Sequence, residues 1–176
     1  MRCFLSIPIP DDIVRGITSL LETQELPSRV RVIGRDLWHV SLVFLGDIAE
    51  TDLDIISVAC SRHSVCPGTL TVRELTTFPN GNPRLLVAGG SANPKQAWTD
   101  FIEDLRVDMM PYAPALDRKP WIPHITVGRG PKDTLLPRWS VPAGTWTWQP
   151  GGFSLMQSAL GPDGPTYTRL HEFPFV

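Results

Sequence analysis

Two short segments of the chain share one pattern, in which a histidine is followed by an aliphatic residue, a hydroxyl residue and a second aliphatic residue. They are His39-Val40-Ser41-Leu42 and His124-Ile125-Thr126-Val127. In a β-strand, residues two apart point to the same side, so each histidine would project together with its hydroxyl residue. If the two strands lie side by side, two imidazoles and two hydroxyls meet in one cleft.

This set of side chains suits a displacement at phosphorus. Such a reaction needs one group that activates the entering oxygen and one that protonates the leaving oxygen, and histidine can do either because its ordinary pKa is about 6.5. The hydroxyls could hold the non-bridging phosphate oxygens. The sequence therefore predicts His39 and His124 as catalytic residues and Ser41 and Thr126 as phosphate-binding residues. A lone histidine on a strand is more often structural, and only the repeated pattern favours catalysis.

Hydrophobic periodicity and turn residues predict the elements that position these side chains. Apolar runs predict strands over residues 2–9, 38–45, 68–75, 84–88, 121–127, 153–159 and 166–173. Helical spacing predicts three helices, with caps at Asp11-Asp12, Thr51 and Asn93-Pro94. The last two strands would form a hairpin around residues 161–165. Because strands and helices mix without strict alternation, the predicted fold class is α+β.

Composition and charge narrow the class of protein. The chain has 176 residues, 42% hydrophobic and 19% charged, so we expect a folded domain with a substantial core. A formal net charge of −2 argues against a general grip on long duplex nucleic acid, but a short or single-ended nucleic acid remains a candidate ligand. Three cysteines, no signal-peptide pattern and no long apolar run predict a cytoplasmic protein without membrane contact.

The two motifs, in this order and with these flanks, resemble the signature motifs of the 2H phosphoesterase superfamily. Within it, the chain looks most like the RNA 2′,3′-cyclic phosphodiesterases, historically called 2′-5′ RNA ligases. The first motif continues as Val43-Phe44-Leu45-Gly46 and the second as Gly128-Arg129. Trp121-Ile122-Pro123 resembles the family's lead-in to the second histidine, and segments 155–158 and 167–170 resemble its terminal hairpin. The resemblance covers nearly the whole length.

The resemblance implies a bilobal fold in which two pseudo-symmetric antiparallel sheets line a central cleft with helices outside. Residues 1–176 would form a single domain of two intertwined lobes. The implied activity is metal-independent hydrolysis of 2′,3′-cyclic phosphates on RNA ends or nucleotides to 2′-phosphates, without a cofactor. By analogy, His39 protonates the ribose 3′ oxygen as it leaves, and His124 activates water. A monomer is expected.

Further site residues follow from the same resemblance. Arg129 would be a phosphate-binding cation, for which a planar guanidinium is suited. Three residues would lie near the base: Phe44, Tyr167 and Ser158. By strand parity, however, Phe44 falls on the apolar side with Val40 and Leu42, where packing in the core is the default, so both interpretations of Phe44 stay open.

Two departures from the family pattern concern the motifs themselves. Ser41 replaces the usual threonine, which keeps the hydroxyl but loses the methyl group that stiffens the side chain, so slightly looser phosphate positioning is expected. Gly128 stands where a bulkier residue is common, and is expected to alter the end of the second strand.

Two other functions are compatible with the sequence. Joining of RNA halves through a 2′-5′ linkage is the reverse of hydrolysis and could share the site. A non-catalytic protein that binds RNA ends or nucleotides is the alternative from another class, although such a protein has no need for two titrating groups. Cys60-Ser61-Arg62-His63-Ser64-Val65-Cys66 resembles part of a zinc site but lacks a fourth ligand, so we interpret it as a helix end passing into a loop.

Overall fold

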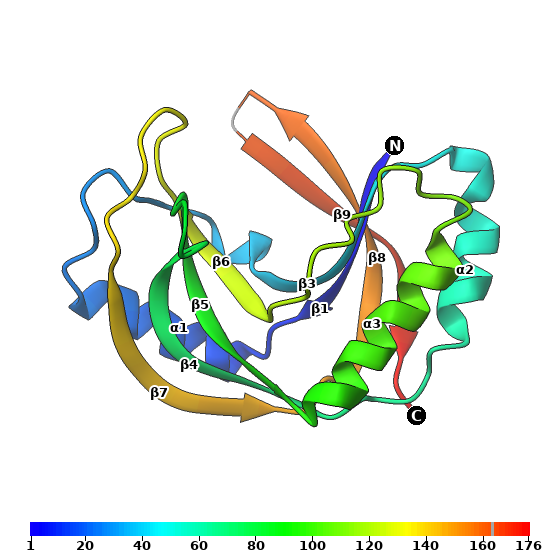
Figure 1. Cartoon of the computed structure of the whole chain (residues 1–176), viewed down its shortest axis with the longest axis horizontal. Coiled ribbons are helices and arrows are strands. Elements are labelled where there is room, and N and C mark those ends of the chain that lie inside the picture. Colours follow the sequence, from blue (N-terminus) through cyan, green and yellow to red (C-terminus); the bar gives the residue numbers. More distant parts are fainter. Residues whose placement is uncertain (163) are drawn as a thin grey trace.

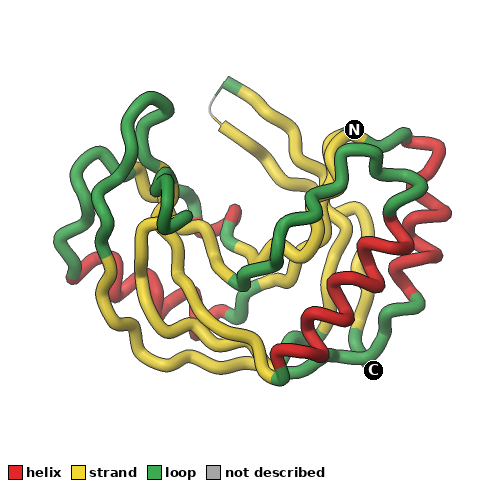
Figure 2. The backbone as a smooth tube through the Cα atoms, in the orientation of Figure 1, coloured by secondary structure: helices red, strands yellow, loops and turns green. Residues whose placement is uncertain are grey.

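In the computed structural model, which describes residues 1–162 and 164–176, a curved antiparallel sheet runs through the molecule and helices pack on its outer side (Figures 1 and 2). The strands are β1 (Arg2–Pro8), β2 (Arg31–Val32), β3 (His39–Asp47), β4 (Thr69–Phe78), β5 (Leu85–Asn93), β6 (His124–Arg129), β7 (Ser140–Trp148), β8 (Gly152–Gly161) and β9 (Gly164–Pro174). The helices are α1 (Asp11–Thr23), α2 (Leu53–Ser61) and α3 (Lys95–Met109), with short 3₁₀ turns at Arg35–Leu37 and Glu50–Asp52. The predicted α+β class is confirmed.

The sheet consists of two four-stranded halves that meet at its centre. The strand order is β7-β4-β5-β6-β3-β1-β8-β9, and the short strand β2 pairs with β6. At the junction β3 and β6 are antiparallel and pair through Val40 and Ile125 alone. The two antiparallel sheets implied by the family resemblance are therefore the halves of one continuous sheet, joined by one residue pair.

The chain crosses between these halves through its helices. Helix α1 follows β1 but packs against β7 of the other half, burying Ile13, Ile17 and Leu21. Helix α3 follows β5 and reaches β3 across the junction. Since each half is covered by chain that comes from the other, we propose that residues 1–176 fold as a single domain.

The strand predictions for 2–9, 38–45, 68–75 and 84–88 are confirmed apart from their ends, and so is the C-terminal hairpin. The hairpin closes where Gly161 pairs with Gly164, while Asp163 of the predicted tip lies outside the described residues. The strand predicted over 121–127 begins only at His124, because residues 121–123 form part of the preceding loop.

The predicted helix caps are wrong in detail. Helix α1 is preceded by Pro10 without a side-chain cap. Asp11 and Asp12 lie in its first turn, where the positive end of the helix dipole stabilises their carboxylates. Thr51 lies in a 3₁₀ turn rather than at the start of α2. Asn93 ends β5 instead of capping α3.

Strand β7 was not predicted because its sequence contains Pro142 and Gly144, which are both unfavourable inside a sheet. It is an edge strand, where proline is tolerated because one side of the strand needs no backbone donor. Its Trp146 packs into a notch on α1 at Gly16, where an added Cβ would lie only 2.7 Å from the indole ring. This contact fixes α1 on the half of the sheet that contains β6.

We predict that Gly16→Leu lowers the free energy of unfolding by about 1–3 kcal/mol, because the new side chain must displace the rigid Trp146 ring. Chemical denaturation followed by tryptophan fluorescence measures the change. The matched control is Gly81→Leu in an exposed turn, where a Cβ meets no atom within 4 Å, and it should change stability by less than about 0.5 kcal/mol. Equal losses in both variants would contradict the packing assigned to Gly16.

Candidate active site

The central strand pair brings the two sequence motifs together. Because Val40 pairs with Ile125 in antiparallel register, His39 and Thr126 flank this pair on one side, and Ser41 and His124 flank it on the other. Each histidine therefore lies beside the hydroxyl residue of the other motif as well as that of its own. Both rings are half-buried at the base of an opening between the halves of the sheet.

Each imidazole is held by a backbone carbonyl from its own segment. His39 Nδ1 lies 2.8 Å from the carbonyl oxygen of Leu37, and His124 Nδ1 lies 2.8 Å from that of Ile122. A carbonyl can only accept, so Nδ1 carries the proton in both rings and donates it to the carbonyl. Nε2 of each ring is then the atom that gains and loses a proton. In His39 this atom lies 3.0 Å from the Ser41 hydroxyl.

Aromatic rings support both imidazoles from the side. Phe4 on β1 lies against His39 with ring centroids 4.9 Å apart, and Phe78 at the end of β4 lies against His124 at 4.8 Å. The interplanar angles of 33° and 32° are nearly the same. Tyr167 on β9 adds an edge contact to His39, with centroids 5.4 Å apart. These ring contacts help to hold each imidazole in one orientation.

The surroundings lower the pKa of both histidines below the ordinary value. Burial is the main cause for each, because it disfavours the charged ring, and the carbonyl that accepts from Nδ1 opposes it. The pKa of His39 is lowered further by the nearby charges of His124 and Arg129. Both imidazoles are thus neutral in the free protein at neutral pH.

A β-bulge decides the position of Phe44. Strand β1 pairs with Ser41 and then with Val43, so Leu42 is an extra residue on β3. A bulge shifts the alternation of sides by one residue. The parity assumed from the sequence is therefore wrong beyond Leu42, and the half-buried Phe44 faces the same side as His39.

Strand β6 contains the same device. Strand β5 pairs with Thr126 and then with Gly128, so Val127 is the extra residue, and Arg129 faces the same side as His124 and Thr126. Phe44 and Arg129 thus occupy equivalent places, each five residues after a histidine and each turned toward the opening by a bulge.

Two adjoining hollows contain all of the predicted site residues. One has a volume of about 460 Å³, and its walls include His39, Ser41, Phe44, Thr126, Arg129, Ser158 and Tyr167. The other, of about 570 Å³, contains His124 together with Phe78 and Trp121. Ser41 and Phe44 line both hollows and form the partition between them.

Three cations in the first hollow were not predicted. Arg2, Arg31 and Lys132 line it with Arg129, and no carboxylate among the described residues does so. Arg2 lies over the Phe44 ring, 4.9 Å from its centroid, as a cation–π contact. Composition cannot place these residues, because they come from three separate segments that meet only in the folded chain.

The loop before His124 is tied directly to β3. The Trp121 indole N–H donates to the carbonyl of Ser41 at 2.8 Å, and the Asp117 N–H donates to that of Phe44 at 3.2 Å. Trp121 also stacks on the buried Trp98 of α3, with centroids 5.5 Å apart. The lead-in to the second motif therefore fixes the backbone of the first motif, a role that its sequence pattern alone does not reveal.

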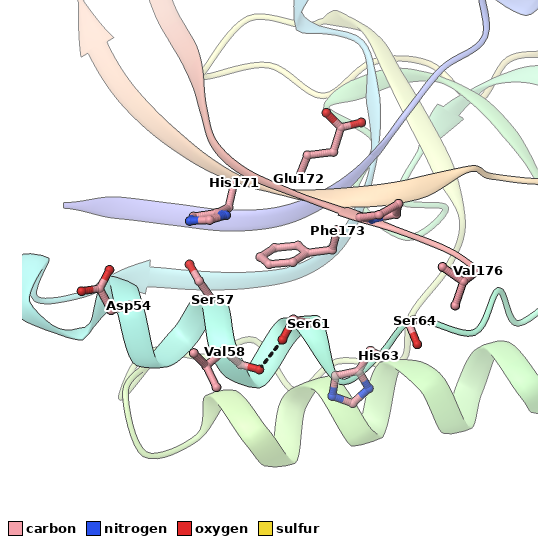
Figure 3. A pocket seen from close by; sticks show the side chains of 11 residues that line it. Asp54, Ser57, Val58, Ser61, His63, Ser64, His171, Glu172, Phe173 and Val176 are labelled. Carbon is pink, nitrogen blue, oxygen red and sulfur yellow. Dashed lines mark hydrogen bonds between the residues drawn. The ribbon is translucent and has the colours of Figure 1, made fainter.

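A further hollow of about 590 Å³ lies elsewhere, between α2 and β9, and contains neither motif (Figure 3). Its half-buried His63 is 3.0 Å from Asp108, so that imidazole is already engaged. Nearby, Cys60 is buried and Cys66 donates to the carbonyl of Gly68.

Two negative findings apply to residues 1–162 and 164–176. They include no group of three or more His, Cys, Asp and Glu side chains that could hold a metal ion. They also include no helix that is long and apolar enough to cross a membrane.

Comparison with known proteins finds relatives of one kind. The chain is 29% identical to an RNA 2′,3′-cyclic phosphodiesterase of Thermus thermophilus, over 98% of this chain and 89% of that one. It is 26% identical to an RNA 2′,3′-cyclic phosphodiesterase of Archaeoglobus fulgidus, over 98% and 99%. The chain matches no protein-family model.

Solved structures agree on the fold. The crystal structure of TT0787 of Thermus thermophilus superposes with a TM-score of 0.80 at 25% identity, covering 99% of this chain and 98% of that one. Escherichia coli LigT complexed with 3′-AMP superposes with a TM-score of 0.77 at 21% identity, covering 99% and 97%. The fold is thus shared over nearly the whole length of the chain.

We predict that both histidines titrate below pH 6.5 in the free protein, and that Arg129→Gln raises the pKa of His39 but not that of His124, because the Arg129 charge acts on His39. Two-dimensional NMR of the imidazole signals across pH measures both values. Since folding depresses these pKa values, the stability that depends on them is fully present above the ordinary value of about 6.5 and is lost as the pH falls from there through the depressed values. Equal shifts of the two rings in Arg129→Gln would contradict the charge geometry.

Proposed function

We propose that this chain, which belongs to the 2H phosphoesterase superfamily together with the RNA 2′,3′-cyclic phosphodiesterases, hydrolyses 2′,3′-cyclic phosphates on RNA ends or nucleotides to 2′-phosphates. The observation that carries the proposal is the pair of imidazoles whose Nδ1 atoms are both committed to carbonyls. In the proposed reaction their Nε2 atoms transfer protons on two sides of one phosphorus atom.

In this mechanism His124 is the general base. Its neutral Nε2 accepts a proton from water, the water oxygen forms a bond to phosphorus, and the bond from phosphorus to the ribose 3′ oxygen breaks. The lowered pKa of His124 keeps its ring neutral and ready to accept. The hollow that contains His124 gives water access to this side of the site.

His39 is the general acid. Protonated His39 donates its Nε2 proton to the leaving 3′ oxygen, which becomes a hydroxyl and leaves the phosphate on the 2′ oxygen. In the free protein this nitrogen is hydrogen-bonded to the Ser41 hydroxyl. The leaving 3′ oxygen of the substrate must therefore replace that hydroxyl as the partner of Nε2. The negative phosphate also favours the charged form of His39, which offsets the effect of burial on its pKa.

The remaining groups hold the phosphate. The Ser41 and Thr126 hydroxyls donate to the non-bridging oxygens, and the Arg129 guanidinium neutralises the charge that develops on them. Phe44, Tyr167 and Ser158 line the same space and are placed to contact the nucleoside. No step requires a metal ion, because proton transfer and charge neutralisation are both supplied by side chains.

The first test is hydrolysis of adenosine 2′,3′-cyclic phosphate in EDTA by the wild-type protein and by His39→Ala and His124→Ala. Loss of a general acid or base should lower kcat by about 10²–10⁴-fold in either variant, and the product should be adenosine 2′-phosphate. His171 is exposed and lies in the separate hollow between α2 and β9. It provides the control variant His171→Ala, which should retain full activity. Hydrolysis that appears only with added divalent metal, or near-normal turnover in either test variant, would reject the mechanism.

The pH dependence of kcat/KM should report the titration of both histidines. We expect kcat/KM to peak on the acid side of neutrality, because both pKa values are lowered, and to fall about tenfold per pH unit above the peak as the acid loses its proton. Arg129→Gln should move the limb that His39 sets to higher pH and leave the other limb in place, since removing that charge raises the pKa of His39. A profile in which neither limb moves would contradict the effect of Arg129 on His39.

A further inference from the structure

Two arginines face each other at the end of the proposed site. Strand β2 pairs with β6 in a register that puts Arg31 directly opposite Arg129. Like charges in this position are destabilising. Among the described residues, neither arginine takes part in an ion pair. An anion bound between them would relieve the repulsion.

A glycine makes this close pairing possible. A Cβ at Gly128 would lie 2.8 Å from a methyl group of Val30 and 3.3 Å from the carbonyl oxygen of Arg31. The pairing is continued by Ile33, whose N–H donates to the carbonyl of Val127 at 3.0 Å. Gly128 therefore lets the segment with Arg31 lie directly against the strand with His124.

Lys132 approaches from the loop after β6, and its backbone is anchored. The Arg84 side chain donates to the carbonyl of Lys132, and the Gly130 N–H donates to the carbonyl of Arg84 at 2.8 Å. Leu136, further along the loop, is buried, and its N–H donates to the carbonyl of Pro83 at 2.8 Å. Lys132 thus has a fixed base, while its exposed ammonium lines the same hollow as Arg31.

These cations exceed what the reacting group needs. A 2′,3′-cyclic phosphate carries one negative charge, which Arg129 balances. Arg31 lies on β2 beside Arg129, and Lys132 follows Arg129 in the loop after β6, so both are at the end of β6 that is remote from His124. Because the cyclic phosphate occupies both the 2′ and the 3′ oxygens, any further phosphate on the same nucleotide must be attached to its 5′ oxygen.

We propose that Arg31 and Lys132 form a second phosphate site, which binds the phosphate on the 5′ oxygen of the terminal nucleotide. The inference rests on the proposed function and adds to it a substrate preference. The cleft selects ends that carry this second phosphate over a cyclic mononucleotide without it. The same chemistry is presented by an internucleotide phosphodiester and by a free 5′-phosphate.

The test compares three substrates in EDTA: adenosine 2′,3′-cyclic phosphate, the same nucleotide with a 5′-phosphate, and the dinucleotide ApA with a 2′,3′-cyclic phosphate end. A charge-assisted contact should give the wild-type protein a kcat/KM about tenfold or more higher for the substrates with two phosphates. The double variant Arg31→Ala/Lys132→Ala should lose most of this ratio. Arg31→Lys should keep part of it, because it keeps the charge but loses the guanidinium geometry.

The matched control removes an equal charge elsewhere, by Arg15→Ala and Lys95→Ala on exposed positions of α1 and α3, and should leave the ratio unchanged. A preference for both two-phosphate substrates supports the site and identifies a terminal phosphate as sufficient. A preference for the dinucleotide alone supports it and identifies the internucleotide phosphodiester. A wild-type ratio near one, or a ratio that survives the double variant, overturns the inference. If the wild-type protein hydrolyses none of the three substrates, the proposed function is overturned instead.

Discussion

One backbone pair, Val40 with Ile125, joins the two halves of the sheet and sets the separation of the two histidines. Since β3 and β6 pair nowhere else, the strands diverge at once, and the opening begins beside the imidazoles. So narrow a junction needs support. The Trp121 indole bonds to the backbone of β3, and α3 reaches across from one half to the other. The spacing of the two histidines thus depends on packing outside the motifs.

Both central strands solve the same geometric problem in the same way. Regular alternation would turn Val43 and Gly128 toward the opening as the third residue from each histidine motif. The bulges at Leu42 and Val127 turn the next residue there instead, which is the aromatic Phe44 on β3 and the cationic Arg129 on β6. Two strands with the same backbone irregularity therefore present different side chains to the opening, an aromatic ring from β3 and a positive charge from β6.

The sequence predicted more of the candidate site than of the fold. Alternation predicted most strands, and the repeated histidine pattern indicated the two strands that meet at the centre. Strand β7 escaped because Pro142 and Gly144 oppose strand structure, and only the edge position in the folded sheet permits them. The side on which Phe44 lies depends on a bulge created by pairing with β1, which local pattern does not encode. Arg31 was missed because its strand is two residues long and exists only through its pairing with β6.

The cluster of Arg2, Arg31, Arg129 and Lys132 has a kinetic consequence for a chain whose formal net charge is −2. Distant polyanions are repelled by the sum of the charges, yet those that come near the opening enter a local field of the opposite sign. Encounter should thus be guided over short range only, within a Debye length of about 8 Å at physiological ionic strength. Productive collisions would be those in which the ligand arrives end first.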